Sequence, residues 1–344
     1  MSHSSRRSFL QHAIAGAGAA AVWNKTAHSS ESSVATAKLP REVWIASYCQ
    51  DSLGPHDPAE MISQSLKDME SMAYLKPDVY CLPEVFPYGV MRGDRPPLSE
   101  SAETPPGPIT RRFADFAAKH QCYVICPIYT KHNGRFYNAA VVIDRQGKVM
   151  GEYQKIHTTV GETDRGITPG PLDAPVFKTD FGIIGVQICF DINWQDGWKS
   201  LRQKGAEIIF WPSAFGGGQQ VNTKAWQNKC CVVSSTRKGT TKICDPDGTT
   251  VVETGHWNQR WAIAPLNLEK VFLHTWPYVR RFEEIQKKYG RNIRIKNYHE
   301  EEWTIIESLS QEIRVADILK EFDLKTHEEH IDIGEREQIK HRAR

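Results

Sequence analysis

The sequence predicts an α/β protein, because short apolar segments typical of strands alternate with amphipathic segments typical of helices along most of its length. The pattern is clear where an apolar segment at 43–49 precedes residues 58–75, in which Met61, Ile62 and Leu66 recur at helical spacing. No Gly/Ser-rich or Pro-rich linker divides residues 40–305. We therefore expect one domain there, with helices on the outer faces of its sheets.

The same reasoning places the other elements in order. Strands are predicted at 43–49, 78–82, 122–129, 136–144, 148–154, 181–189, 206–211, 231–235, 243–245, 249–253 and 261–266. Helices are predicted at 58–75, 108–120, 195–204, 221–228 and 277–288. Residues 144–147 are expected to form a hairpin turn, and the proline-rich stretch 91–108 a surface loop.

Composition excludes few function classes but argues against charged partners. The chain has 344 residues with 43 Lys+Arg against 41 Asp+Glu, a formal net charge of +2. This balance offers no electrostatic reason to expect nucleic acid or an anionic membrane as a partner. No stretch after residue 40 has the length and apolarity of a membrane span. A small-molecule substrate is the partner we expect.

The first 37 residues predict an export signal. Arg6 and Arg7 are adjacent, an apolar run follows at 13–23, and Ala35-Thr36-Ala37 is a small-residue cleavage site. This order is typical of a twin-arginine signal, which a receptor recognises. We expect a signal peptide at 1–37 and a bacterial protein that is exported to the periplasm or the extracellular space.

The eight cysteines are expected to be free. Most lie in apolar strand-like runs, where a buried thiol acts as a small hydrophobic side chain. They are Cys49, Cys81, Cys122, Cys126, Cys189, Cys230, Cys231 and Cys244. No Cys/His pattern has the spacing of a zinc site, so we expect no metal.

Four reactive side chains lie at or just after the ends of predicted strands. Glu84, Lys155 and Cys189 each follow an apolar run, and Glu162 lies in the next loop after Lys155. A cysteine at a strand-to-helix turn has an exposed sulfur and nearby backbone N–H groups, here of Phe190 and Asp191, that can hold an oxyanion. A carboxylate can take the thiol proton, and an ammonium adds fixed positive charge. Together these groups suit acyl transfer from nitrogen, although each alone is more often structural.

His157 raises the alternative of a Cys–His dyad, as in papain-like proteases. That chemistry requires a histidine and an asparagine far downstream and another motif around the cysteine. The sequence lacks this context, so we expect His157 to have a structural or supporting role.

The chain resembles the nitrilase superfamily of carbon–nitrogen hydrolases over about residues 42–268. Three motifs in the family's order carry the resemblance: Pro-Glu-Val-Phe at 83–86, Glu-Tyr-Gln-Lys-Ile-His at 152–157 and Gly-Val-Gln-Ile-Cys-Phe-Asp at 185–191. Glu162 falls where many members carry a second glutamate. The resemblance implies a four-layer αββα sandwich, a homodimer or higher homo-oligomer, and no metal or organic cofactor.

The resemblance also implies roles. Glu84 would deprotonate Cys189, Lys155 and the Phe190 N–H would hold the oxyanion, and Glu162 would orient Lys155 or the attacking water. Trp194 and Phe215 are candidates for lining the substrate pocket.

Two departures from family patterns bear on the substrate. Nitrilases usually carry Cys-Trp-Glu at the nucleophile, whereas this chain has Cys-Phe-Asp at 189–191, which favours an amide over a nitrile. N-carbamoyl amino acid hydrolases typically have arginines soon after the cysteine, and residues 191–194 supply none. Arg165 or Arg237 could replace them from other loops. A sandwich that binds a ligand without catalysis stays a further alternative, although all four catalytic residue types are present.

We therefore expect a hydrolase domain at 38–309 and a charged C-terminal extension at 310–344, which is a candidate dimer arm. Apolar positions from Ile313 to Phe322 predict that its first part packs, whereas from Glu328 we expect disorder.

Overall fold

Two six-stranded sheets dominate the computed structural model, which describes residues 38–255, 257 and 259–342. The predicted export signal at 1–37 lies outside the described residues. None of the described helices is long and apolar enough to cross a membrane.

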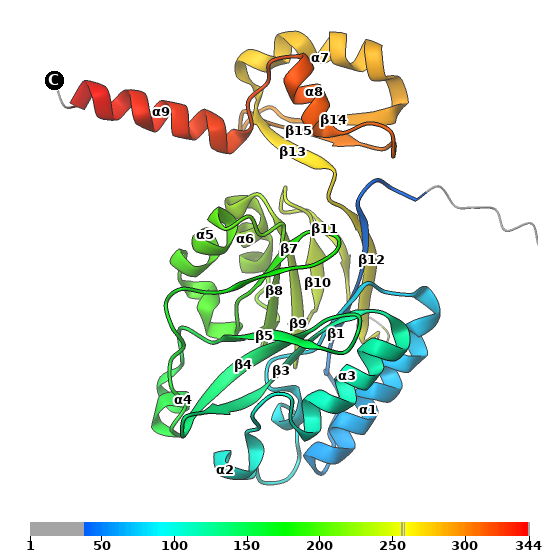
Figure 1. Cartoon of the computed structure of the whole chain (residues 1–344), viewed down its shortest axis with the longest axis vertical. Coiled ribbons are helices and arrows are strands. Elements are labelled where there is room, and N and C mark those ends of the chain that lie inside the picture. Colours follow the sequence, from blue (N-terminus) through cyan, green and yellow to red (C-terminus); the bar gives the residue numbers. More distant parts are fainter. Residues whose placement is uncertain (1–37, 256, 258, 343–344) are drawn as a thin grey trace, which may run out of the picture. The chain divides into compact units, whose positions relative to one another are not determined.

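The first sheet has the strand order β12-β1-β2-β3-β4-β5, in which β1, β2 and β3 are parallel. Its strands are β1 (Glu42–Tyr48), β2 (Val79–Cys81), β3 (Tyr123–His132), β4 (Arg135–Ile143), β5 (Val149–Gln154) and β12 (Trp261–Asn267). Helices α1 (Pro58–Met72) and α3 (Pro108–His120) cover one face (Figure 1). Met61 and Phe113 pack there with Tyr80 of β2. The Asp57 side chain accepts from the Glu60 N–H and caps α1, which stabilises a helix by about 1 kcal/mol.

The second sheet has the order β11-β10-β9-β8-β7-β6, with β7, β8 and β9 parallel. Its strands are β6 (Val176–Lys178), β7 (Ile183–Val186), β8 (Ile208–Ser213), β9 (Cys231–Thr236), β10 (Lys242–Cys244) and β11 (Thr250–Glu253). Helices α5 (Asp196–Gln203) and α6 (Gln219–Asn228) lie beside it (Figure 1). The predicted αββα sandwich is confirmed.

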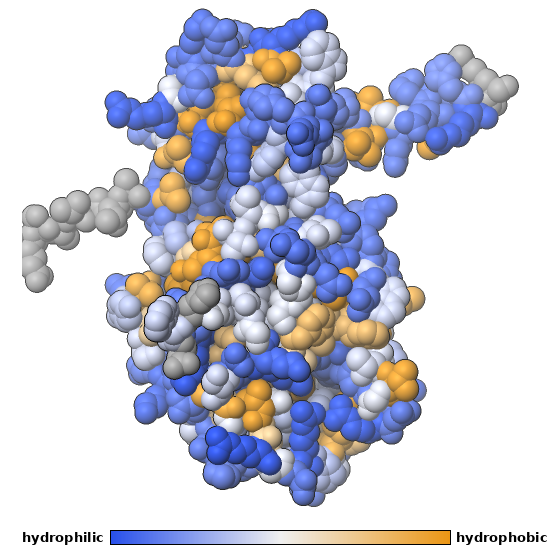
Figure 2. Space-filling model, turned by 180° about the vertical axis from the view of Figure 1, so that it is seen from behind, coloured by the Kyte–Doolittle hydropathy of each residue, from blue (hydrophilic) through white to orange (hydrophobic). Residues whose placement is uncertain are grey.

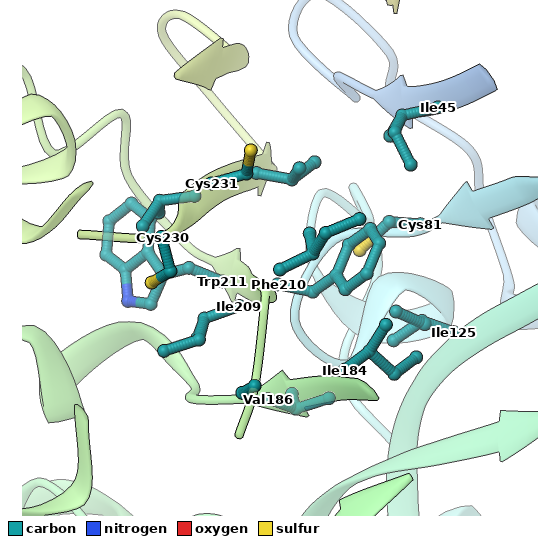
Figure 3. Close-up of a cluster of buried hydrophobic side chains, with 14 of the residues drawn as sticks. Ile45, Cys81, Ile125, Ile184, Val186, Ile209, Phe210, Trp211, Cys230 and Cys231 are labelled. Carbon is teal, nitrogen blue, oxygen red and sulfur yellow. The ribbon is translucent and has the colours of Figure 1, made fainter. Parts of the chain in front are cut away.

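The largest core lies between the two sheets. Ile45, Cys81 and Ile125 from the first sheet belong to the same buried cluster as Ile184 and Phe210 from the second (Figure 3). Because successive strand residues point to opposite faces, Tyr80 faces the α1 and α3 side while Val79 and Cys81 face the other sheet. All eight cysteines are free and buried, as the sequence predicts.

A third sheet follows β12 and was not predicted. It contains β13 (Lys270–His274), β15 (Trp303–Ser308) and β14 (Ile293–Tyr298), in that order. Its core joins residues of α7 (Thr275–Tyr289) and α8 (Val315–Glu321), so the first part of the C-terminal extension does pack. The expectation of disorder from Glu328 is wrong, because α9 (His327–Arg342) is helical there; hydrophilic side chains cover most of it (Figure 2).

The other predicted elements occur within a few residues of their expected ends. The expected strand at 181–189 is shorter than predicted, because the chain leaves the sheet after Val186 and turns at Cys189. The expected loop at 91–108 contains the short helix α2 (Leu98–Ser101).

Candidate active site

The four predicted reactive residues come from four segments that the sheets bring together. Glu84 follows β2 and Cys189 follows β7, which are both members of parallel strand groups. Lys155 follows β5, and Glu162 lies in the short helix α4 (Val160–Asp164). The carboxyl ends of parallel strands are where α/β proteins bind ligands, because loops rather than packed strands meet there.

Lys155 joins the two glutamates. Its Nζ lies 2.8 Å from Glu84 Oε1 and 2.8 Å from Glu162 Oε2. All three side chains are buried, with exposed fractions of 1% for Lys155, 3% for Glu84 and 7% for Glu162. Glu162 is also held locally, since its carboxylate accepts from the Thr159 N–H at 2.8 Å in a capping box.

The charges of this cluster are set by their mutual contacts. Burial alone would raise the pKa of Glu84, but the positive charges of Lys155 and Arg237 outweigh it and lower that pKa to about 2. Burial likewise favours neutral Lys155, yet Glu84 and the other acidic groups raise the pKa of Lys155 above its usual value. At neutral pH, Glu84 is therefore a carboxylate and Lys155 an ammonium.

Asn138, in the middle of β4, is a component that the sequence analysis missed. Its Nδ2 donates to Glu84 Oε1 at 2.8 Å and to Glu162 Oε1 at 2.7 Å. Asn138 thus fixes the separation of two carboxylates that would otherwise repel each other. No local motif marks it, because strand pairing of β4 alone brings it to the site.

Cys189 lies in a strained turn. Its φ is +47°, which is uncommon for a non-glycine residue, and it opens a 3-10 turn, Cys189–Asn193. Trp211 Nε1 donates to the Cys189 carbonyl at 3.0 Å and holds the turn. Ser213 and the Ala214 N–H lower the pKa of Cys189, and the sequence analysis did not single out either of them.

Burial and the Glu84 charge raise the pKa of Cys189 to about 12, although Lys155 opposes them. The resting side chain is therefore a thiol beside an ionised carboxylate. A nucleophilic reaction at this sulfur needs a base that removes the proton as the bond forms.

The Asp191 carboxylate holds the same turn through hydrogen bonds. Its Oδ2 accepts from the Ile188 N–H at 2.9 Å and from the Tyr153 hydroxyl at 2.7 Å. Its Oδ1 accepts from the His157 N–H at 2.8 Å and lies 2.9 Å from His157 Nδ1. His157 is thus tied to Asp191, which supports a structural role for it.

The two backbone N–H groups expected at the oxyanion differ in whether they already have a hydrogen-bond partner. The Asp191 N–H is used within the turn, where it donates to the Ile188 carbonyl at 3.0 Å. The Phe190 N–H has no hydrogen-bond partner among the described residues, so it is the available donor next to the sulfur.

The candidate pocket aromatics lie near the nucleophile turn. Trp194 stacks on His157 with ring centroids 4.1 Å apart, and 39% of its surface is exposed. Phe215 is half-buried with its ring against Trp211, and its N–H donates to Ser213 Oγ at 3.1 Å. Phe215 therefore also orients the Ser213 hydroxyl, a group that lowers the pKa of Cys189.

Arg237 completes the Glu84 side of the site. Its Nε donates to the Glu84 carbonyl at 2.6 Å, and its Nη2 lies 3.5 Å from Glu84 Oε2. Among the described residues, no three His, Cys, Asp or Glu side chains are grouped as metal ligands.

Comparison with known proteins identifies the family of the chain. Residues 45–272 match the family model described as "Carbon-nitrogen hydrolase". Beta-ureidopropionase of Arabidopsis thaliana is 31% identical over 148 residues, which span 41% of this chain and only 36% of that protein. A nitrilase of Pyrococcus abyssi is 29% identical over 187 residues, or 53% of this chain and 71% of the relative.

The fold is also similar to that of an amidase from Nesterenkonia sp., with a TM-score of 0.57 and 14% identity over 73% of this chain and 98% of the amidase. That structure is described as a glutamate-to-glutamine mutant with the acetamide moiety of fluoroacetamide added covalently at the active-site cysteine. Since the family model matches most of the chain, this protein belongs to the carbon–nitrogen hydrolase family.

Proposed function

We propose that the chain hydrolyses the C–N bond of a small amide through a thioester on Cys189. The observation that carries the proposal is a buried carboxylate–ammonium pair, Glu84 and Lys155, whose charges act on a thiol held in a strained turn. This combination supplies a base, a fixed positive charge and a nucleophile in one place.

In the first half of the reaction, Glu84 takes the thiol proton while Cys189 Sγ attacks the amide carbon. The Phe190 N–H and Lys155 Nζ stabilise the negative oxygen of the tetrahedral intermediate, and a single such donor typically contributes about 10²–10³ in rate. The C–N bond then breaks, and ammonia or an amine leaves with the proton from Glu84.

In the second half, Glu84 takes a proton from water, whose oxygen attacks the thioester carbon. The C–S bond breaks, the acid is released and the thiol recovers its proton. Asn138 and Glu162 keep Glu84 and Lys155 in place during both halves.

An amide is favoured over a nitrile by the residues after the nucleophile. Phe190 and Asp191 replace the Trp-Glu pair usual in nitrilases, and Asp191 is fully engaged in holding the turn. A carbamoyl group is the second candidate, since its carbon is attacked in the same way and a beta-ureidopropionase is among the relatives.

Ammonia release by the full chain tests the proposal. Simple amides, carbamoyl amino acids and nitriles are compared, with Cys189→Ala assayed beside the parent protein. We expect release from amides that the substitution abolishes. Equal rates for parent and variant would contradict the mechanism, and silence across the panel from folded protein would favour a binding role.

Export through the twin-arginine route and assembly as a homodimer stay predictions. Fractionation of expressing cells with an Arg6→Lys, Arg7→Lys variant tests the first. Light scattering of the purified protein tests the second.

A further inference from the structure

The segment that carries the proposed base has a strained backbone. Val85, directly after Glu84, has φ +36° and ψ +50°, a left-handed conformation that β-branched residues rarely adopt. Val85 is also buried, with 2% exposed. A backbone conformation of this kind persists only where surrounding contacts fix it. The contacts of residues 84–86 therefore determine how the Glu84 carboxylate is oriented.

Two long side chains from other segments hold the carbonyl groups of residues 84–86. Arg237 Nε donates to the Glu84 carbonyl at 2.6 Å, and Gln50 Nε2 donates to the Phe86 carbonyl at 3.0 Å. Arg237 also approaches the carboxylate itself, since its Nη2 lies 3.5 Å from Glu84 Oε2. Arg237 thus contacts the proposed base through both its backbone and its side chain.

Arg237 is itself tied to the nucleophile side of the site. It follows β9, and its backbone N–H donates to the Ser213 carbonyl at 3.0 Å. Ser213 is the residue whose side chain lowers the pKa of Cys189. The Arg237 side chain is mostly buried, with 12% exposed. One residue therefore connects the segment of the base with the segment beside the nucleophile.

The Arg237 side chain has space because residue 89 is a glycine. Gly89 has φ −67° and ψ −43°, a conformation that any residue adopts, so backbone freedom does not explain the glycine. A Cβ at this position would lie 2.5 Å from Arg237 Cδ, 2.7 Å from Nε and 3.0 Å from Cγ. These distances are shorter than van der Waals contact. A side chain at position 89 would therefore displace Arg237 from the Glu84 carbonyl.

We infer that Gly89 and Arg237 are positioning residues for Glu84: the missing side chain at Gly89 admits Arg237, which holds the Glu84 segment beside the nucleophile. The inference rests on the proposed function and deepens it, because a general base must lie within hydrogen-bond reach of the proton that it removes. It also assigns Arg237 to the protein's own base rather than to a substrate carboxylate.

A double-mutant cycle tests the pair at a temperature where circular dichroism shows all variants folded. Gly89→Ala and Arg237→Ala should each lower kcat for amide hydrolysis at least about tenfold, because a misplacement of about 1 Å can cost about 10² in rate. The double variant should be within about twofold of Arg237→Ala, since the added methyl group then has no arginine to displace. Losses that multiply in the double variant would overturn the inference.

The split between KM and kcat distinguishes positioning from substrate binding. In both single variants KM should stay within about twofold of the parent value, since the interaction acts on the base and not on bound substrate. A rise in KM with unchanged kcat would mean that Arg237 binds substrate, which would overturn the inference. Gly54→Ala is the matched control, because its Cβ would lie 2.5 Å from Nε of Arg92, whose exposed side chain can move away. It should leave kcat unchanged.

Urea unfolding separates this inference from the proposed function, because it needs no turnover. Gly89→Ala should lower the unfolding midpoint of the parent protein. In Arg237→Ala the same change should leave the midpoint unchanged or raise it, since alanine reduces the entropy of the unfolded chain. That pattern in a protein that hydrolyses no amide would support the Gly89–Arg237 contact and contradict the proposed catalysis. Equal kcat in the parent protein and folded Gly89→Ala would leave the hydrolase intact and overturn the positioning role.

Discussion

The molecule assembles nearly the same set of side chains twice, once at the candidate site and once where β13 meets the second sheet. The first set contains Cys189, Lys155, Glu84, Glu162 and Asn138. The second contains Cys231, Lys270, Asp245, Glu307 and Asn267. Each is a lysine between two carboxylates, with an asparagine that donates to a carboxylate and a thiol nearby; Lys155 is fully buried and Lys270 is partly exposed.

Backbone geometry separates the two thiols. Cys231 begins β9, lies in extended pairing beside Ile208 of β8 and is fully buried (Figure 3). Cys189 instead occupies a turn with φ +47°, next to the Phe190 N–H, which has no partner in the described part of the chain. Burial raises the pKa of Cys231 well above its usual value without any turn to present the sulfur. The same residue types therefore occur in two different backbone settings, and only at Cys189 do they accompany a strand-to-turn geometry.

The carboxylates differ as well. Lys155 and Arg237 together lower the pKa of Glu84 to about 2, despite burial. At Asp245, burial together with the nearby carboxylates of Asp247 and Glu307 outweighs Lys270, and the pKa of Asp245 is raised. A second cation, Arg237, and the Asn138 hydrogen bond are among the contacts that lower the pKa of Glu84.

The largest expected effect distinguishes the two cysteines. Cys189→Ala should lower kcat by at least about 10³-fold, as loss of a nucleophile does in enzymes of this kind. Cys231→Ala should retain turnover and cost about 1–2 kcal/mol of unfolding free energy, because it removes a small buried side chain. Ammonia release and urea unfolding measure both. Loss of turnover in folded Cys231→Ala would contradict the view that only Cys189 takes part in the reaction.

The two lysines provide the next test. Removing one partner of a buried ion pair costs about 3–5 kcal/mol, so Lys155→Met and Lys270→Met should both lower the unfolding midpoint. At a temperature where both variants are folded by circular dichroism, only Lys155→Met should have lost amide hydrolysis. Comparable activity of the two variants would argue against a role of Lys155 at the oxyanion.

Asn138 and Asn267 form a further matched pair. Asn138→Ala removes a hydrogen bond that lowers the pKa of Glu84, so the acid limb of the kcat/KM profile should shift to higher pH, with kcat reduced about tenfold. Asn267→Ala should only destabilise the fold, by about 1–3 kcal/mol, since its Nδ2 bonds to Glu307 Oε1 and the Ser308 carbonyl lie outside the site. An unshifted acid limb in Asn138→Ala would reduce Asn138 to a packing residue.

The smallest expected effect is on how the unfolding free energy changes with pH. The folded pKa of Glu84, about 2, lies below the unfolded value of about 4.3, so its contribution is complete above pH 5 and is lost as pH falls toward 2. The raised pKa of Asp245 acts in the opposite direction, because the folded state then binds more protons. Glu84→Gln should therefore flatten the fall in unfolding free energy between pH 5 and pH 3, and Asp245→Asn should steepen it. If the unfolding free energy fell equally steeply with pH in the two variants, the charges assigned to Glu84 and Asp245 would be contradicted.

Much of the fold could be predicted because its elements have strong periodic patterns. The third sheet was missed although Ile293 and Ile295 alternate with polar residues, since the surrounding charge obscured the pattern. Helix α4 was missed despite a readable capping-box signal, Thr159 followed by Glu162 three residues later.

The candidate site could be predicted in part because four of its residues lie in recognisable motifs. Asn138, Ser213 and Arg237 lie in or just after strands without such motifs, and only the pairing of the sheets brings them beside Glu84 and Cys189. The spacing of residues along the sequence does not show which residues so far apart in the chain come into contact.

The central question is which of the eight cysteines forms a covalent bond with an amide reagent. Full-length protein carrying Glu84→Gln is incubated with fluoroacetamide, digested and mapped by mass spectrometry. Without the proposed base the amide of the reagent is not hydrolysed, and a cysteine sulfur that displaces its fluoride keeps the acetamide group as a stable thioether. We expect the added mass on the peptide that contains Cys189 and none on the peptide that contains Cys231. An adduct confined to another cysteine, or unmodified Cys189 in the variant although the parent protein hydrolyses amides, would contradict the assignment of Cys189 as the nucleophile.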